Sequence, residues 1–218
     1  MLSFAEEIML LLLEDEDGRF VHAPDHYLRC VLSGAVLMDL ALKGKIDTDL
    51  DSLVIIDPEP TGDDLLDPIL ERLTKEGKNH DAQYWVEHCQ SLSGEIREKA
   101  LARLCERGIL SQEDDRFLWV FKSRRYPVVD GQAEREVKLR IMSILFSDEI
   151  PDPRDIAIVG LMDAGGLFKY LLSERELKGV AERIEQVRNM DLIGQAVTVS
   201  VREIERQLAQ VTMAAARI

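Results

Sequence analysis

Four basic side chains on one predicted helix are the residues of this chain best suited to bind an anion. The helix covers residues 94–107 and carries Arg97, Lys99, Arg103 and Arg107. Arg103 and Arg107 share a helix face because they are four residues apart, whereas Arg97 points elsewhere. The planar guanidinium of arginine offers paired donors to phosphate oxygens, so this helix is a candidate phosphate site. The alternative is a solvated surface on which glutamates of the same helix pair with the cations.

A second group of basic residues surrounds an aromatic segment. The basic residues are Arg116, Lys122, Arg124 and Arg125. We predict a hairpin in which Phe117–Phe121 pairs with Tyr126–Val129. Such a hairpin would place Trp119 at a membrane interface, with Arg124 and Arg125 beside the lipid phosphates.

The hairpin has two alternative interpretations. Its aromatic side chains could fill the core or a dimer contact, because aromatic strands are most often buried. The order of a helix, the segment Glu106–Leu110 and a hairpin is also typical of a winged-helix protein, whose basic wing contacts DNA phosphates.

The sequence gives little support for a metal site or an enzyme. His22, His26 and Cys30 are spaced by four residues, a spacing that could present zinc ligands on one helix, but Pro24 interrupts the pattern. There is no nucleophile elbow, glycine-rich phosphate loop or HExxH motif. We therefore expect no metal, no cofactor and no catalytic activity.

Composition indicates an acidic globular protein with one basic stretch. The chain has 218 residues and a net charge of −14, and we predict a single domain over residues 1–218. This charge argues against nucleic acid as a partner, because nucleic acids are polyanions. Residues 94–140 hold 11 basic and 9 acidic groups, whereas residues 1–93 hold 7 and 20. An anion-binding surface should therefore come from the middle of the chain.

The remaining composition indicates the cytoplasm. The apolar run Ile8–Leu13 is too short to span a bilayer, which needs roughly 20 residues. Cys30, Cys89 and Cys105 are odd in number and lack metal-like spacing, which favours a reducing compartment.

Periodicity predicts a mainly α protein. A helix from Pro24 or Asp25 to about Leu42 is apolar almost all round in its second half, so it should be central and buried. Leu53–Ile56 is predicted as a short strand or a buried extended segment. Further helices are predicted at about residues 63–76, 79–92, 94–107, 132–147, 154–172, 174–188 and 195–214.

Four blocks of sequence resemble the Golgi phosphoprotein 3 family, in the family's order. They are Leu2–Leu13, Ser33–Ile46, Pro60–Asp67 and Ile96–Leu110. The third block has the family signature Pro-Thr-Gly-Asp-x-Leu-Leu-Asp, and the resemblance covers about residues 2 to 195. It implies a mainly α single domain, a helical bundle wrapped by amphipathic helices, with one small β-hairpin that reaches toward a membrane or partner.

The resemblance also implies a ligand. Family members hold the phosphate of phosphatidylinositol 4-phosphate with two arginines three residues apart, a third basic residue and a tryptophan on the preceding long helix. Arg97 matches one of these arginines, whereas Gly94, Ser33 and a position near Pro24 stand at the other three. Arg29, as a cation, and Tyr27, as an aromatic wall, are the candidate substitutes.

These observations predict a peripheral membrane-type phospholipid-binding module with a partly retained headgroup site. The predicted headgroup residues are Arg97, Arg29 and Tyr27, and the predicted membrane-facing residues are Trp119, Arg124 and Arg125. The alternatives are a soluble protein–protein interaction module without lipid and, below it, a winged-helix nucleic-acid binder. The expected partner is an anionic phospholipid headgroup, with protein clients and homo-oligomerisation left open.

Since the first predicted helix begins directly at Ser3, the resemblance favours a bacterial-type cytoplasmic homologue over a Golgi adaptor with its basic arm. We expect such a homologue to work at the inner face of a membrane.

Overall fold

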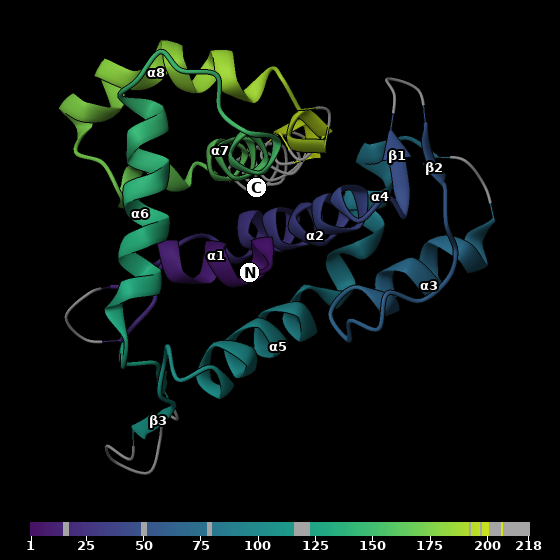
Figure 1. The fold of residues 1–218 in the computed structure, drawn as a ribbon, viewed down its shortest axis with the longest axis horizontal. Helices are drawn as coiled ribbons and strands as arrows, with labels where there is room; N and C mark the ends of the chain where they lie inside the picture. Colours follow the sequence, from purple (N-terminus) through teal and green to yellow (C-terminus); the bar gives the residue numbers. More distant parts are fainter. Residues whose placement is uncertain are drawn as a thin grey trace, which may run out of the picture.

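Helices dominate the computed structural model, as the sequence predicted (Figure 1). The structure describes residues 1–14, 18–48, 52–77, 80–115, 123–191, 193–196, 198–200 and 206. Its helices are α1 (Phe4–Leu11), α2 (Asp25–Leu42), α3 (Asp67–Glu76), α4 (Ala82–Cys89), η1 (Gln90–Leu92), α5 (Ser93–Glu106), α6 (Gly131–Leu145), α7 (Pro153–Ala164), η2 (Leu167–Tyr170) and α8 (Glu174–Arg188). Most of the predicted helix at 195–214 falls outside the described residues, although residues 193–196 and 198–200 are helical.

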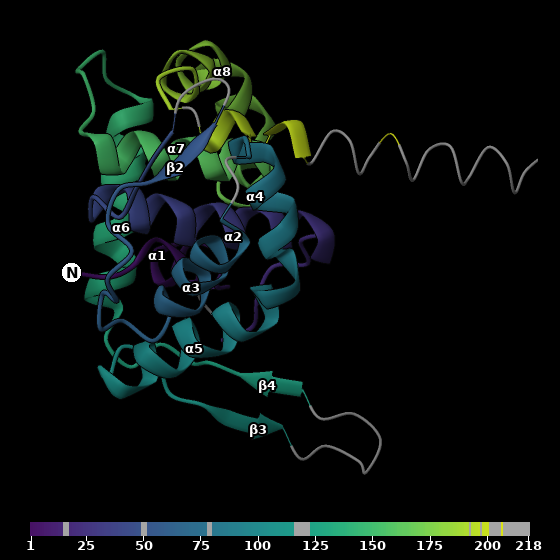
Figure 2. The ribbon, with the colours of Figure 1, turned by 90° about the vertical axis from the view of Figure 1, so that its right-hand side faces the viewer.

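Helix α2 lies at the centre of the molecule. It packs against α1, α3, α4, α5 and α7. Figures 1 and 2 show it in a middle layer with α1, between a layer of α7 and α8 and a layer that contains α3 and α5. Its second half is buried from Ala35 to Leu40, which confirms the prediction of a central helix.

Helix α1 carries both of its acidic side chains into the core. Ser3 and Glu6 form a capping box at its start, but Glu6 and Glu7 are both buried. Asp39 of α2 is buried beside them and accepts a hydrogen bond of 2.9 Å from the backbone N–H of Phe4. Buried carboxylates are costly unless they are paired, so the surrounding helices must supply cations.

Arginines from three other helices meet these carboxylates. Arg107, at the end of α5, lies 3.5 Å from Glu6. Arg140 of α6 and Arg154 of α7 lie 2.5 and 3.0 Å from Glu7, respectively. The ion pairs join α1 to α5, α6 and α7, which lie far apart in the sequence.

The described residues contain two short antiparallel sheets. Strands β1 (Ile46–Thr48) and β2 (Leu53–Ile55) form one, which confirms a strand near Leu53. Strands β3 (Glu113–Asp115) and β4 (Ser123–Arg125) form the predicted hairpin, which extends beyond α5 toward the back of the molecule (Figure 2).

The hairpin's strands differ from the predicted ones. Phe117–Phe121 lies outside the described residues, and Tyr126–Val129 forms no strand beyond an isolated bridge at Val128. The N–H of Tyr126 instead donates to the carbonyl of Gly18, and Pro127 has no N–H with which to extend a ladder. Gly18 is required there, because its φ is +64° and a Cβ would lie 2.5 Å from the nitrogen of Pro127.

The predicted helix at 154–172 is wrong in its extent, because α7 ends at Ala164 and η2 follows. The glycine pair after α7 causes the break: Gly166 adopts φ +59°, a left-handed conformation. A Cβ at Gly165 would lie 2.7 Å from Cγ2 of Val31, so this glycine allows α7 to approach α2 closely.

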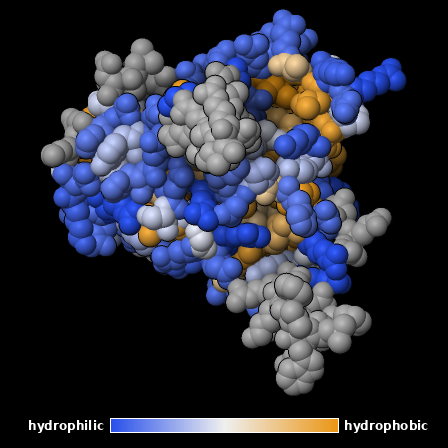
Figure 3. Space-filling model, turned by 180° about the vertical axis from the view of Figure 1, so that it is seen from behind, coloured by the Kyte–Doolittle hydropathy of each residue, from blue (hydrophilic) through white to orange (hydrophobic). Residues whose placement is uncertain are grey.

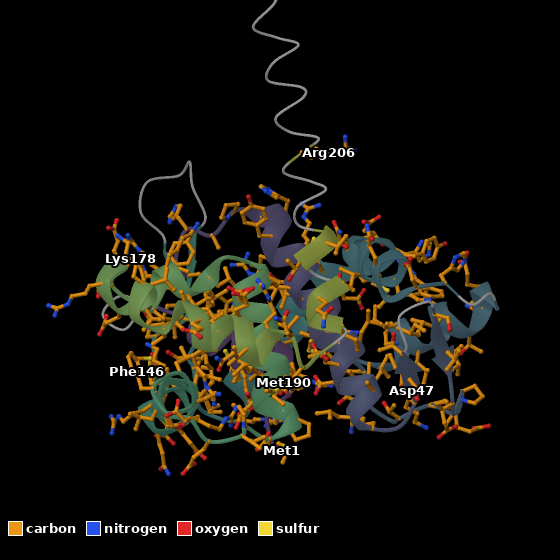
Figure 4. The ribbon with its side chains drawn as sticks, turned by 90° about the horizontal axis from the view of Figure 1, so that it is seen from above. Met1, Asp47, Phe146, Lys178, Met190 and Arg206 are labelled. Carbon is orange, nitrogen blue, oxygen red and sulfur yellow. The ribbon has the colours of Figure 1, made fainter. Side chains whose placement is uncertain are left out.

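Different elements form the two ends of the molecule's long axis (Figure 4). Phe146 and Lys178 lie toward the end formed by α6 and α8, and Asp47 toward the end formed by β1 and β2 (Figure 4). None of the helices in the described part of the chain is long and apolar enough to cross a membrane.

Replacing Leu37 with aspartate tests the central position of α2. Leu37 is fully buried, so Leu37→Asp would leave an unpaired charge in the core and cost several kcal/mol, roughly 3–5, in the free energy of unfolding. The matched control is Leu42→Asp, on the same helix but 51% exposed, which should cost about 1 kcal/mol or less. Urea denaturation would measure both, and equal losses would contradict a central α2.

Asp39 should make stability depend on pH. Burial raises the pKa of Asp39 to about 7, against the opposing effects of the Phe4 N–H and Arg154. Between about pH 4 and 7 the folded protein therefore retains a proton that the unfolded chain releases, and stability falls as pH rises. Asparagine cannot ionise, so we expect the stability of Asp39→Asn relative to the parent to increase by about 2–3 kcal/mol from pH 5 to pH 8.

Urea denaturation at both pH values measures this difference, with Asp47→Asn at the exposed surface as the control. A difference between Asp39→Asn and the parent that stays constant across the two pH values would show that Asp39 is ionised throughout.

Candidate functional site

Arg29 and Arg97 line the same pocket, here called the α2–α5 pocket. It has a volume of about 460 Å³ and lies between the first turns of α2, the segment η1 and the first turn of α5. Neither residue is near the other in sequence, and the packing of α2 on α5 brings them together. The sequence predicted both residues as phosphate ligands, and the structure brings these two of the three predicted headgroup residues into one cavity.

Arg97 is half-buried, and its guanidinium stands over an aromatic ring. Its Cζ lies 5.2 Å from the centroid of Phe20, within the range of a cation–π contact. Among the residues that the structure describes, none forms a hydrogen bond or ion pair with this guanidinium. Arg97 thus lines the pocket with a guanidinium that has no protein acceptor from the described ranges.

Arg29 is held by an acidic neighbour on the same helix. Its Nε and Nη2 donate to Oδ2 of Asp25 at 2.8 and 2.5 Å. The two side chains are 54% and 66% exposed, and an exposed pair of this kind contributes only about 0.3–0.5 kcal/mol. An anion in the pocket can therefore displace the carboxylate at low cost.

The two family positions that lack arginine differ in their surroundings. Ser33 is fully buried and its hydroxyl donates to the carbonyl of Arg29 at 2.9 Å, so an arginine would not fit there. Arg29 precedes Ser33 by one turn on the same face of α2, which places a cation near the position where the family has its arginine. Gly94 lines the pocket, and a Cβ built on it meets no atom within 4 Å.

Tyr27 lies elsewhere. Two residues on a helix are separated by about 200°, so Tyr27 and Arg29 point to nearly opposite sides of α2. Tyr27 lines a different pocket, of about 430 Å³, together with Lys169 and Arg188. Its ring packs edge-on against His26, with the centroids 4.1 Å apart. The structure therefore does not place Tyr27 as a wall of the α2–α5 pocket.

The hairpin is joined to the pocket through Phe20. The ring of Phe20 lies 5.7 Å from that of Tyr126, which directly follows β4, and Phe20 also contacts Arg97. In the hairpin register Arg125 is opposite Glu113 and Arg124 is opposite Asp114. Trp119 lies outside the described residues, as does the tip of the hairpin.

The signature block folds into a loop that is attached to α5. Asp67 accepts hydrogen bonds from the N–H and hydroxyl of Thr61, at 2.7 and 2.6 Å, and from the N–H of Gly62. Arg103 of α5 forms ion pairs with both Asp63 and Asp64. Leu66 precedes α3 and provides no side-chain cap, and Asp63 instead accepts a hydrogen bond of 2.9 Å from the N–H of Leu65 in the turn before the helix.

The other basic residues of α5 have structural partners. Lys99 pairs with Glu95 at 2.8 Å, Arg103 holds the signature loop, and Arg107 pairs with Glu6. Among the described residues of α5, Arg97 is the basic side chain that remains available to a ligand.

The structure separates the residues of the candidate zinc spacing, His22 and Cys30. No group of three or more potential ligands gathers anywhere in the described ranges. His22 lies before α2, whereas Cys30 is buried within it and accepts a hydrogen bond of 3.2 Å from Gln90. Burial raises the pKa of the Cys30 thiol to about 12, which makes it a poor nucleophile.

A family model described as Golgi phosphoprotein 3 (GPP34) matches residues 4–204. No curated protein matches the chain. The matched range includes α2 and α5, which form the α2–α5 pocket, and also the hairpin of β3 and β4.

Proposed function

The chain belongs to the Golgi phosphoprotein 3 family, and from this premise we propose that it is a peripheral phospholipid-binding module. The proposed site for the lipid phosphate is the α2–α5 pocket. The observation that carries the proposal is the guanidinium of Arg97, which occupies a pocket without a protein acceptor among the described residues. We assign no catalytic activity to this pocket.

Arg97 would hold the phosphate by two parallel N–H···O bonds. A planar fork suits this task, and the Phe20 ring beneath it restricts the guanidinium's orientation. Arg29 would become a second donor once its carboxylate partner is displaced, at the small cost of an exposed ion pair.

The hairpin would contact the membrane beside the headgroup. Phe20 and Tyr126 connect its base to Arg97, so a lipid held at Arg97 brings the hairpin toward the bilayer. The back of the molecule, toward which the hairpin extends, is mainly hydrophilic but has hydrophobic areas on the hairpin's side (Figure 3). Trp119, Arg124 and Arg125 are the proposed interfacial residues.

The affinity should be low for phosphatidylinositol 4-phosphate, the ligand that the family resemblance implies. A charged hydrogen bond contributes about 1.5–3 kcal/mol, and Gly94 and Ser33 supply no cation. Peripheral attachment at the inner face of a membrane remains our proposal for the cellular location.

A protein–protein interaction module is the second candidate, favoured by one exposed surface. Leu139 of α6 and Phe146, the residue that directly follows this helix, are both more than half exposed. Ile150, shortly after them, is 87% exposed.

A nucleic-acid binder is disfavoured, because β3 of the would-be wing consists of Glu113, Asp114 and Asp115. These acidic residues and the net charge of −14 would both oppose a phosphate backbone.

Mutation of Arg97 tests the proposed site. We expect Arg97→Ala to lower sedimentation with phosphatidylethanolamine–phosphatidylglycerol vesicles about tenfold or more, since a charged hydrogen bond is lost. Arg97→Lys should restore only part of the binding, because lysine lacks the bidentate fork. The control is Arg175→Ala on exposed α8, which removes the same charge elsewhere. Unchanged binding by Arg97→Ala would place the lipid site outside the pocket.

Arginine at position 94 should strengthen the site. Gly94 is three residues before Arg97 on the same face and has open space at its Cβ, so Gly94→Arg would supply a second fork. We expect about a tenfold gain with vesicles that contain phosphatidylinositol 4-phosphate. Gly179→Arg, on exposed α8 with equally open space, adds the same charge away from the pocket and should give no comparable gain. Equal gains would indicate non-specific attraction.

A further inference from the structure

The α2–α5 pocket contains as many carboxylates as guanidinium groups. Arg29 and Arg97 line it, and so do Asp25 and Glu98. Asp25 and Arg29 lie on one side, on α2, and Arg97 and Glu98 on the other, on α5. A site for a simple anion would be expected to have more cationic than anionic side chains in its lining. The charges of the residues that line this pocket instead sum to zero.

The net charge of the whole molecule leads to the same expectation about the ligand. A net charge of −14 opposes approach to an anionic bilayer, whereas a bilayer without net charge produces no such repulsion. Both the local and the total charge therefore disfavour a strongly anionic lipid as the ligand.

We propose that the α2–α5 pocket binds a zwitterionic phospholipid headgroup, in which a phosphodiester anion is followed by a primary ammonium group. This inference rests on the proposed function and specifies its ligand. The phosphate binds Arg97, and the ammonium takes the place of Arg29 at the Asp25 carboxylate. Arg29, released from Asp25, turns to the same phosphate, so the ion pair of 2.5 Å that is lost is replaced by two new ones.

Ethanolamine fits this pocket better than choline. A primary ammonium donates three hydrogen bonds, and the Asp25 carboxylate in the pocket lining is an acceptor for it. A quaternary ammonium donates none and is recognised by aromatic cages. The residues described as lining the pocket include no aromatic side chain.

Vesicle sedimentation distinguishes the ligands. The vesicles are phosphatidylcholine alone, phosphatidylcholine with phosphatidylethanolamine, and phosphatidylcholine with the same fraction of phosphatidylglycerol. We expect the parent protein to bind the ethanolamine vesicles about two- to fivefold better than the other two, the effect of one exposed ion pair. Soluble glycerophosphoethanolamine should compete, and glycerol phosphate should compete less.

Asp25→Asn is the decisive variant, because Asp25 is exposed and the change preserves the side chain's shape. It should lose the preference for ethanolamine and gain binding to phosphatidylglycerol, since a negative charge leaves the pocket. Better binding of the parent to phosphatidylglycerol, or an Asp25→Asn variant with an unchanged preference, would overturn the zwitterionic ligand and leave the proposed function standing. Absence of binding to all the vesicles would overturn the proposed function itself.

Discussion

The need to neutralise buried carboxylates constrains the whole fold. Glu6, Glu7 and Asp39 meet where the first turn of α1 packs on α2, and Asp155 of α7 is buried nearby. Such groups are destabilising without partners, so α5, α6 and α7 must each deliver an arginine to this region. Once Arg107 fixes the end of α5 against α1, the start of the same helix lies beside the first turns of α2. The α2–α5 pocket is a consequence of that placement.

Local chemistry was sufficient to predict the elements of this arrangement. The predicted bounds of α2 agree with the structure because Pro24 fixes its start, apolar residues fill its second half and Gly44 follows its end. The spacing of Ser3 and Glu6 is that of a capping box, but the burial of Glu6 is not encoded locally, since a capping box is usually solvated. The glycine pair after Ala164 accounts for the break there, whereas the close approach of α7 to Val31 that Gly165 permits is a tertiary contact that no local pattern encodes. The same is true of the strands, because Gly18 and not a partner strand binds the N–H of Tyr126.

The candidate site was predictable in part. Arg97 and Arg29 were identified by residue type and family position, and tertiary packing places them in one pocket. Tyr27 is close to Arg29 in sequence, but the rotation of about 200° between the two positions, which the sequence does contain, puts it on another side of α2. The pairing of Arg29 with Asp25 is also an ordinary i, i+4 spacing. Recognising that this pair makes the pocket electrically balanced requires the position of Glu98 on the opposite helix. The family fold is thus combined with a phosphate site whose charge differs from that implied by the resemblance.

Hydrogen–deuterium exchange of the parent protein, with and without vesicles of phosphatidylcholine and phosphatidylethanolamine, tests most directly whether lipid binds in the α2–α5 pocket. We expect slower exchange in residues 25–32 and 90–98, which form the pocket, and unchanged exchange in α3, which lines other cavities of the molecule. Protection confined to the backbone amides of α6 and of the residues that follow it would favour a protein-interaction surface. Protection that spares both pocket segments while vesicles are bound would contradict the account.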